Sequence, residues 1–136
     1  RCRQLAEYVI FESPFGMLCD SPSNYMKEDE CTKFIAQVPT TWDETVVLDG
    51  KVGEYLVVAR KKGYKWYIGA ITNWEERDIV LDLSALPGFG AKSGKIFRDG
   101  PNANRVACDY VSETVQVMGN TLKLHLAKGG GAVMIF

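Results

Sequence analysis

The sequence predicts a mainly β protein, an antiparallel β-sandwich of about eight strands preceded by a short helical segment. From Thr41 onward, short alternating runs of apolar residues follow one another at intervals of roughly ten residues, which is typical of a sandwich or barrel. The run Glu54–Thr72 predicts a hairpin, because Gly63 can supply the positive φ of a tight turn between two β-rich arms. Before Thr41, apolar residues recur at helical spacing instead. We therefore place a helical segment at residues 1–38 and a β-sandwich domain at residues 39–136.

The helical segment contains two amphipathic stretches. Leu5, Tyr8 and Val9 share one face of a helix that should end near Glu12. A second helix is expected over residues 27–37, with acidic residues in its first turn. Because the two sheets of a sandwich already cover each other, the natural packing partner of these helices is expected upstream of this chain. Without that partner, we expect the helices either to fold back over one face of the sandwich or to pack against a second copy of the chain.

The strands are predicted from alternation and from the turn residues between them. Both arms of the hairpin are apolar on both faces, as expected for central strands that are covered on two sides. The strands are expected at residues 45–48, 54–60, 65–72, 77–83, 95–98, 106–118, 121–127 and 132–136.

Composition excludes several classes of partner. The formal net charge is −1, so no overall basic field is present to hold a polyanion, and nucleic acid is excluded as a partner. No run approaches the roughly 20 apolar residues that a membrane-spanning helix needs, so no membrane partner is expected. The 46% hydrophobic content fits a compact globular domain.

Several strings resemble, in the same order, the C-terminal portion of glycoside hydrolase family 97. The most specific is Pro39–Thr45, which reads Pro-Thr-Thr-Trp-Asp-Glu-Thr. Upstream of it, Arg1–Ala6 and Glu12–Pro14 resemble the end of that family's catalytic barrel, and downstream Trp66–Gly69 resembles its C-terminal domain. The chain is therefore identified as the last barrel helices plus the C-terminal β-sandwich of an enzyme of the α-glucosidase or α-galactosidase type.

The resemblance implies a non-catalytic portion of a longer enzyme. The implied partners are an upstream (β/α)8 barrel of the same polypeptide and, for the parent enzyme, an oligo- or polysaccharide from which it removes terminal α-linked glucose or galactose. Calcium is expected in the parent's barrel, and no cofactor is expected in this chain. The resemblance also implies a periplasmic or secreted location. Since the family's catalytic glutamates and calcium ligands lie upstream, we assign no catalytic, cofactor-binding or metal-binding residue here.

Three residues are candidates for contact with a sugar or with a neighbouring domain. Trp42 beside Asp43 offers an aromatic face with a nearby acceptor, which suits a pyranose, and Trp74 lies in a predicted hairpin loop. The alternative is structural: Trp42 would pack at the junction of barrel and sandwich, Asp43 would cap a turn, and Trp74 would be a loop residue.

Other chemistry is disfavoured by the residues themselves. The single histidine, His125, alternates with apolar residues that point inward, so it should face solvent without a nucleophile beside it. The loop at residues 99–104, together with Asp109, has oxygen ligands but lacks the spacing of a calcium-binding EF-hand loop. The cysteines show no paired spacing and are expected to be buried free thiols, with a disulfide left open: Cys2, Cys19, Cys31 and Cys108.

Three functions remain open at this point. The first is a non-catalytic support for the barrel of an α-glycosidase. The second is a carbohydrate-binding module, which would need exposed aromatic side chains in a coplanar row. The third is a plain interaction domain, which would show a large exposed apolar patch.

Overall fold

The structure, a computed structural model, describes all of residues 1–136. Three helices precede eight strands and one short 3-10 helix. In chain order the elements are α1 (Cys2–Ile10), α2 (Pro22–Lys27), α3 (Asp29–Gln37), β1 (Glu44–Lys51), β2 (Tyr55–Lys62), β3 (Lys65–Thr72), β4 (Arg77–Asp82), η1 (Leu83–Ala85), β5 (Ser93–Asp99), β6 (Tyr110–Gln116), β7 (Thr121–Leu126) and β8 (Gly131–Ile135).

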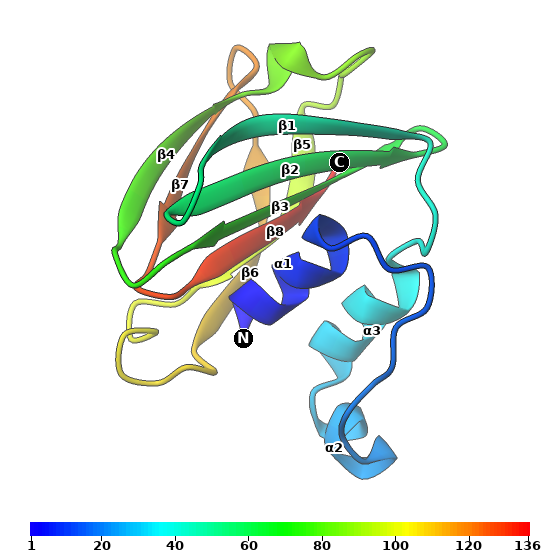
Figure 1. The fold of residues 1–136 in the computed structure, drawn as a ribbon, viewed down its shortest axis with the longest axis vertical. Coiled ribbons are helices and arrows are strands. Elements are labelled where there is room, and N and C mark those ends of the chain that lie inside the picture. The colour runs from blue at the N-terminus through cyan, green and yellow to red at the C-terminus, as the bar shows by residue number, and fades with distance from the viewer.

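The strands form two antiparallel sheets that face each other. The large sheet has the order β1-β2-β3-β8-β5-β6, and the small sheet pairs β4 with β7 (Figure 1). A core cluster fills the space between them, with Val57, Ile68, Leu81, Leu124 and Met134 among its buried members. The predicted fold class, a mainly β sandwich of about eight strands after a helical segment, is confirmed.

The predicted hairpin occupies the middle of the large sheet. β2 pairs with β3 from Tyr55↔Thr72 to Lys62↔Lys65, and Gly63 takes the positive φ of 61° that the turn requires. Alternate residues of β2 pack into two different core clusters: Val57 points toward the small sheet, and Val58 points to the opposite face. Each arm is therefore apolar on both faces, since each face has its own cover.

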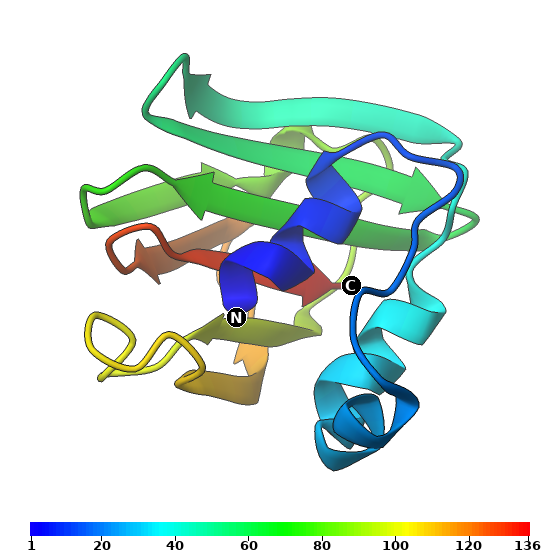
Figure 2. The ribbon, with the colours of Figure 1, turned by 60° about the horizontal axis from the view of Figure 1, so that its bottom comes forward.

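The second cover is the helical segment. α1 lies across β3 and β8 on the face that points away from the small sheet, and α3 lies beside it (Figure 2). A second core cluster joins Leu5 and Val9 of α1 and Phe34 of α3 to Tyr67 and Val133 of the sheet. α1 therefore folds back over one face of the sandwich, which is one of the two outcomes expected for the chain without an upstream partner. The reason is that the large sheet has an apolar outer face that the two-stranded sheet cannot reach.

A glycine allows α1 to approach the sheet closely. A Cβ built on Gly69 of β3 would lie 2.8 Å from the carbonyl oxygen of Ala6 and 2.9 Å from Cγ1 of Ile10. Both distances are shorter than real side-chain contacts allow, so any larger residue at this position would push the helix away. α1 therefore packs directly against the backbone of β3.

Some predicted boundaries differ from those observed. The helix predicted over residues 27–37 begins two residues later, at Asp29, because the backbone leaves the helical region at Glu28, between α2 and α3. The strand predicted at 106–118 is shorter, because residues 101–108 form turns held by Asp109, whose Oδ2 accepts a hydrogen bond from the Asn102 N–H over 2.8 Å. The predicted division after residue 38 falls in the connection between α3 and β1, although packing joins the two parts.

Candidate functional site

Trp42 lies at the junction of the helical segment and the sandwich. It is half-buried, and the edge of its ring meets Tyr67 of β3 with ring centroids 5.3 Å apart. The guanidinium carbon of Arg60 lies 5.9 Å from the Trp42 ring centroid. These two contacts use much of the aromatic surface that a sugar would need, so the observed role of Trp42 is packing.

Asp43 closes the β2–β3 turn. Its carboxylate accepts hydrogen bonds from the Gly63 N–H over 2.7 Å and from the Lys62 ammonium over 3.1 Å. The Gly63 hydrogen bond, and then Lys62, hold the pKa of the Asp43 carboxyl below its usual value. Asp43 is therefore an ionised turn cap, which matches the structural alternative for this residue.

Trp74 is well separated from the other two candidates. It is 84% exposed in the β3–β4 loop, where its ring lies against Gly129 of the β7–β8 turn. Trp42 lies near the first residues of β3 and Trp74 beyond its last, so the two indoles are roughly 20 Å apart at about 3.3 Å per strand residue. The structure brings Trp42 and Asp43 together but does not place Trp74 in a row with them. Contact of any of the three with sugar remains a prediction.

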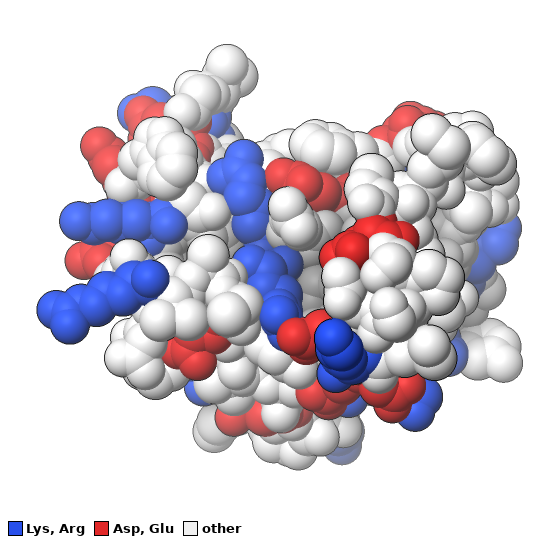
Figure 3. Space-filling view, turned by 90° about the horizontal axis from the view of Figure 1, so that it is seen from below, with Lys and Arg blue, Asp and Glu red and all other residues white.

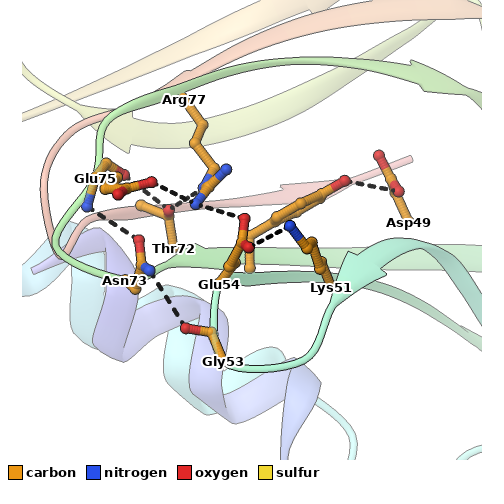
Figure 4. A network of polar contacts seen from close by, with 9 residues as sticks. Asp49, Lys51, Gly53, Glu54, Thr72, Asn73, Glu75 and Arg77 are labelled. Atoms are coloured by element: carbon orange, nitrogen blue, oxygen red, sulfur yellow. Dashed lines mark hydrogen bonds and ion pairs between the residues drawn. The ribbon is translucent and has the colours of Figure 1, made fainter.

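A polar network surrounds the loop that carries Trp74 (Figure 4). Arg77 of β4 lies between Glu54 and Glu75, with nitrogen–oxygen distances of 3.0 and 2.9 Å. Its Nε also donates to the Thr72 hydroxyl over 3.1 Å. The Asn73 amide reaches the Gly53 carbonyl over 3.3 Å. The network therefore ties the β1–β2 turn to the β3–β4 loop and leaves its glutamates paired with cations.

The remaining titratable groups do not gather into a reactive or metal-binding cluster. No three His, Cys, Asp or Glu side chains lie close enough to hold a metal ion. Asp99 is buried and accepts hydrogen bonds from the Ala127 and Gly131 N–H groups over 3.0 and 2.8 Å. Burial raises the pKa of the Asp99 carboxyl, although these donors oppose the shift. His125 is exposed, as predicted, and contacts only the Asp78 carboxylate, over 2.8 Å.

The cysteines are divided between core and surface. All four are free; Cys2 and Cys31 are buried, while Cys19 and Cys108 are exposed. Burial raises the pKa of the Cys2 thiol to about 12, so it stays protonated and unreactive at neutral pH. The expectation of buried free thiols holds for two of the four, and the two exposed thiols lie in loops.

A hollow of the surface lies on the helical segment. It measures about 980 Å³ between the three helices and the loop after α1, and its lining includes Tyr8, Phe11, Met17 and Leu18. Residues 11–26 contain only two charged side chains, Glu12 and Asp20. Figure 3 shows this area, on the right of the view from below, as largely uncharged. Several of its large apolar side chains are at least half exposed: Phe11, Phe15, Met17, Leu18 and Met26.

Comparison with known proteins places the sandwich in a family. Residues 41–136 match the family model described as "Glycosyl-hydrolase 97 C-terminal, oligomerisation". The chain belongs to this family. The resemblance seen in the sequence is thereby confirmed, and so is the interpretation of the sandwich as a C-terminal, non-catalytic part of a glycoside hydrolase.

Relatives cover almost the whole chain, helical segment included. It is 58% identical over 132 residues to a retaining alpha-galactosidase of Bacteroides thetaiotaomicron and 36% identical over 133 residues to a probable retaining alpha-galactosidase of Streptomyces bingchenggensis. It spans 20% of the length of each, and 96% and 97% of this chain is aligned.

Solved structures of the family share the fold. A family 97 enzyme of a Pseudoalteromonas strain, in complex with panose, superposes with a TM-score of 0.91 at 36% identity, over 99% of this chain and 22% of that one. A beta-arabinopyranosidase superposes with a TM-score of 0.85 at 30% identity, over 99% of this chain and 21% of that one. The family 97 enzyme and the beta-arabinopyranosidase therefore share this arrangement of helices and sandwich.

Sequence reasoning did not single out two features of the structure. It gave no role to the surface of residues 11–26, although the near absence of charge over sixteen residues was a readable signal. It also gave no role to Arg60, which is only 6% exposed and has no carboxylate partner. Nothing in the alternation of β2 distinguishes Arg60 from an exposed arginine at the end of a strand.

Proposed function

We propose that this chain is the C-terminal support domain of a longer enzyme that removes terminal α-linked galactose from oligo- or polysaccharides. The observation that carries the proposal is the 58% identity, over 96% of the chain, to a retaining alpha-galactosidase. Terminal α-linked glucose is the alternative substrate, favoured by the family 97 structure that was solved with panose. We assign no catalytic group to the chain itself, and the glutamates of the network around Arg77 are paired with cations.

The partner within the polypeptide is proposed to be an upstream (β/α)8 barrel. The relatives are about five times as long as this chain, so most of the polypeptide lies outside it. The uncharged surface of residues 11–26 is suited to such a contact, because several large apolar side chains there are exposed to water. Covering each of them gains on the order of 1 kcal/mol at about 25 cal/mol per Å².

Calcium in the upstream barrel and a periplasmic or secreted location complete the proposal. Both rest on family resemblance alone and on no residue of this chain. No helix of this structure is long and apolar enough to cross a membrane.

A carbohydrate-binding role is less well supported. Such modules present aromatic rings in one plane, whereas Trp42 is half-buried and Trp74 lies at the other end of β3. Trp66, the third tryptophan, is buried in the core between the sheets.

Activity of the complete polypeptide tests the proposal. We expect turnover of an aryl α-galactoside to exceed that of the matching aryl α-glucoside at least tenfold. A galactose product that first forms as the α-anomer, followed by proton NMR, would show retention of configuration. Preference for the glucoside would replace galactose by glucose, and activity toward neither substrate would refute the proposal.

The barrel contact has its own test in the complete polypeptide. Phe15→Ser should lower the melting temperature by several degrees, because Phe15 is proposed to be covered there. Tyr64→Ser, at an exposed tip of the β2–β3 hairpin, is the matched control and should leave the melting temperature unchanged. Equal and negligible effects of the two changes would show that residues 11–26 stay uncovered.

A further inference from the structure

A second hollow lies on the same face as the helices, at the corner that α1 does not cover. It measures about 540 Å³, and its lining comes from β1, the β1–β2 turn, β2, β3 and Asn73, with Arg3 of α1 at its edge. Figure 2 shows β1 and the neighbouring part of β2 with no helix in front of them. We call this surface the β1 corner and define it by four apolar residues, Val47, Val52, Leu56 and Ile71.

The β1 corner combines exposed apolar side chains with an open centre. Val47 is 64% exposed and Val52, at the tip of the turn, is fully exposed. Gly50 and Gly53 line the same hollow and carry no side chains to fill it. The network around Arg77 holds the turn in place, since Lys51 and Arg77 both bind Glu54. The surface is therefore preformed, and a partner would not have to order it.

The charges around the β1 corner are balanced. Arg3 and Glu7 form an ion pair of 3.1 Å on the α1 side, and Lys51 pairs with Glu54 on the side of the turn. In a twofold dimer the same patch faces itself, so a rim of one sign would repel its copy, whereas a rim of both signs can pair with it. Charge complementarity therefore favours a second copy of this chain as the occupant.

Two further observations favour the same occupant. The family model, whose description names oligomerisation, begins at residue 41 and so contains all four residues that define the corner. The hollow between the helices is lined along the length of α1, from Arg1 to Phe11, and every residue that lines it precedes the matched region. The upstream barrel and a second copy would thus use different surfaces.

A β-bulge in β1 indicates how two copies would pack against each other. The register with β2 shifts between Val47 and Asp49, which marks a β-bulge. A bulge twists an edge strand away from regular pairing, so a second copy would pack face to face rather than extend the sheet. A stable interface buries about 800 Å² per partner. The charged rim must therefore take part together with the apolar centre.

We propose that the β1 corner is a twofold contact surface between copies of this chain, building on its proposed function as the C-terminal domain of a family 97 enzyme. Val47 of each copy would lie close to the axis, because it is the exposed apolar residue of β1 itself.

The test measures the mass of the complete polypeptide by light scattering at micromolar concentration. The wild type should be a dimer or a higher multiple, and Val47→Arg should weaken its association at least tenfold, because two arginines would face each other across the axis. Val80→Arg is the matched control, since Val80 is 61% exposed on the outer face of β4 and should leave the mass unchanged. Mixing Val47→Arg with Val47→Glu should restore association.

The outcomes separate this proposal from the proposed function. A monomeric wild type, or a Val47→Arg variant with unchanged mass, would overturn the β1-corner contact even if α-galactosidase activity is present. Dissociation by Val47→Arg without glycosidase activity would support the contact and refute the proposed function. If Val47→Arg lowers the melting temperature, the mass of Val52→Glu tests the contact instead, because substitution of a fully exposed turn residue should not affect folding.

Discussion

Arg60 of β2 donates a hydrogen bond from Nη2 to the carbonyl oxygen of Ile10, over 2.9 Å. Ile10 is the last residue of α1, where carbonyl groups have no partner within the helix and carry a partial negative charge. The buried guanidinium therefore caps the C-terminal end of α1 beneath the ring of Trp42, and it compensates part of its desolvation there. This contact joins the helical segment to the sandwich.

Replacing Arg60 should destabilise the protein. We expect Arg60→Ala to lower the free energy of unfolding by about 2–4 kcal/mol, because it leaves a cavity and an unpartnered carbonyl. Arg60→Met should cost less than half as much, since it keeps the packed stem and removes the unpartnered Nε. Urea denaturation measures both. Equal losses for the two variants would show that the hydrogen bond, and not the packing, dominates.

The close approach of α1 to β3 predicts the effect of adding one methyl group. Gly69→Ala should destabilise by roughly 1–3 kcal/mol, because the new Cβ would collide with the backbone of α1. Gly16→Ala is the matched control, since a Cβ there meets no atom within 4 Å. Thermal melting compares the two, and an unchanged melting temperature for Gly69→Ala would mean that α1 can shift without cost.

Removing residues 1–38 should leave the large sheet without its outer cover. Val58, Tyr67, Phe97 and Val133 would become exposed, and losing roughly 50–100 Å² of burial from each amounts to about 5–10 kcal/mol. This is comparable with the whole stability of a small domain. We expect the truncated chain to lose cooperative unfolding in a circular dichroism melt. A sharp transition would instead show that residues 39–136 fold independently, as a domain boundary after residue 38 requires.

The two candidate tryptophans should respond differently to substitution. Trp42→Ala should lower the free energy of unfolding by about 2–3 kcal/mol, less than for a fully buried aromatic residue. Trp74→Ala should change it by less than about 1 kcal/mol, because the ring is mostly exposed. Titration of both variants and the wild type with galactose or melibiose, followed by fluorescence, should show no saturable change. A saturable signal that disappears in Trp74→Ala would restore the sugar-binding interpretation.

The contact of α3 with β5 and β6 should depend on pH. Glu30 accepts hydrogen bonds from the Ser112 hydroxyl over 2.7 Å and from the Lys95 ammonium over 2.9 Å. The Ser112 hydrogen bond, and then Lys95, hold the pKa of the Glu30 carboxyl below its ordinary value of 4.5. The folded state therefore binds this proton less readily than the unfolded state, and the stabilisation is complete above pH 4.5 and is lost as the pH falls through the lowered pKa.

Glu30→Gln isolates this contribution. The difference in unfolding free energy between wild type and variant should be at most about 1 kcal/mol at pH 7, because the group is solvent-screened. It should shrink toward zero near pH 3. Asp29→Asn, whose carboxylate contacts only the exposed Lys33 of its own helix, is the control. A difference that grows on acidification would contradict the lowered pKa.

The class of fold, the hairpin at its centre and the family can all be predicted from the sequence. These features depend on local signals: alternation, the glycine of a two-stranded turn, and the string from Pro39 to Thr45. The sequence also predicts correctly that His125 faces solvent, because neighbours in a strand point to opposite faces.

The element that covers the outer face of the large sheet becomes known only from the folded chain. An amphipathic pattern shows that a helix has a partner but not which partner, and here Gly69 leaves room for α1 beside residues more than fifty positions away in the chain. The same holds for the candidate residues. Asp43 caps the β2–β3 turn because its carboxylate accepts a hydrogen bond from the Gly63 N–H, and the length of β3 separates Trp42 from Trp74. Such relations depend on how distant segments pack, because composition and periodicity describe only neighbours in the chain.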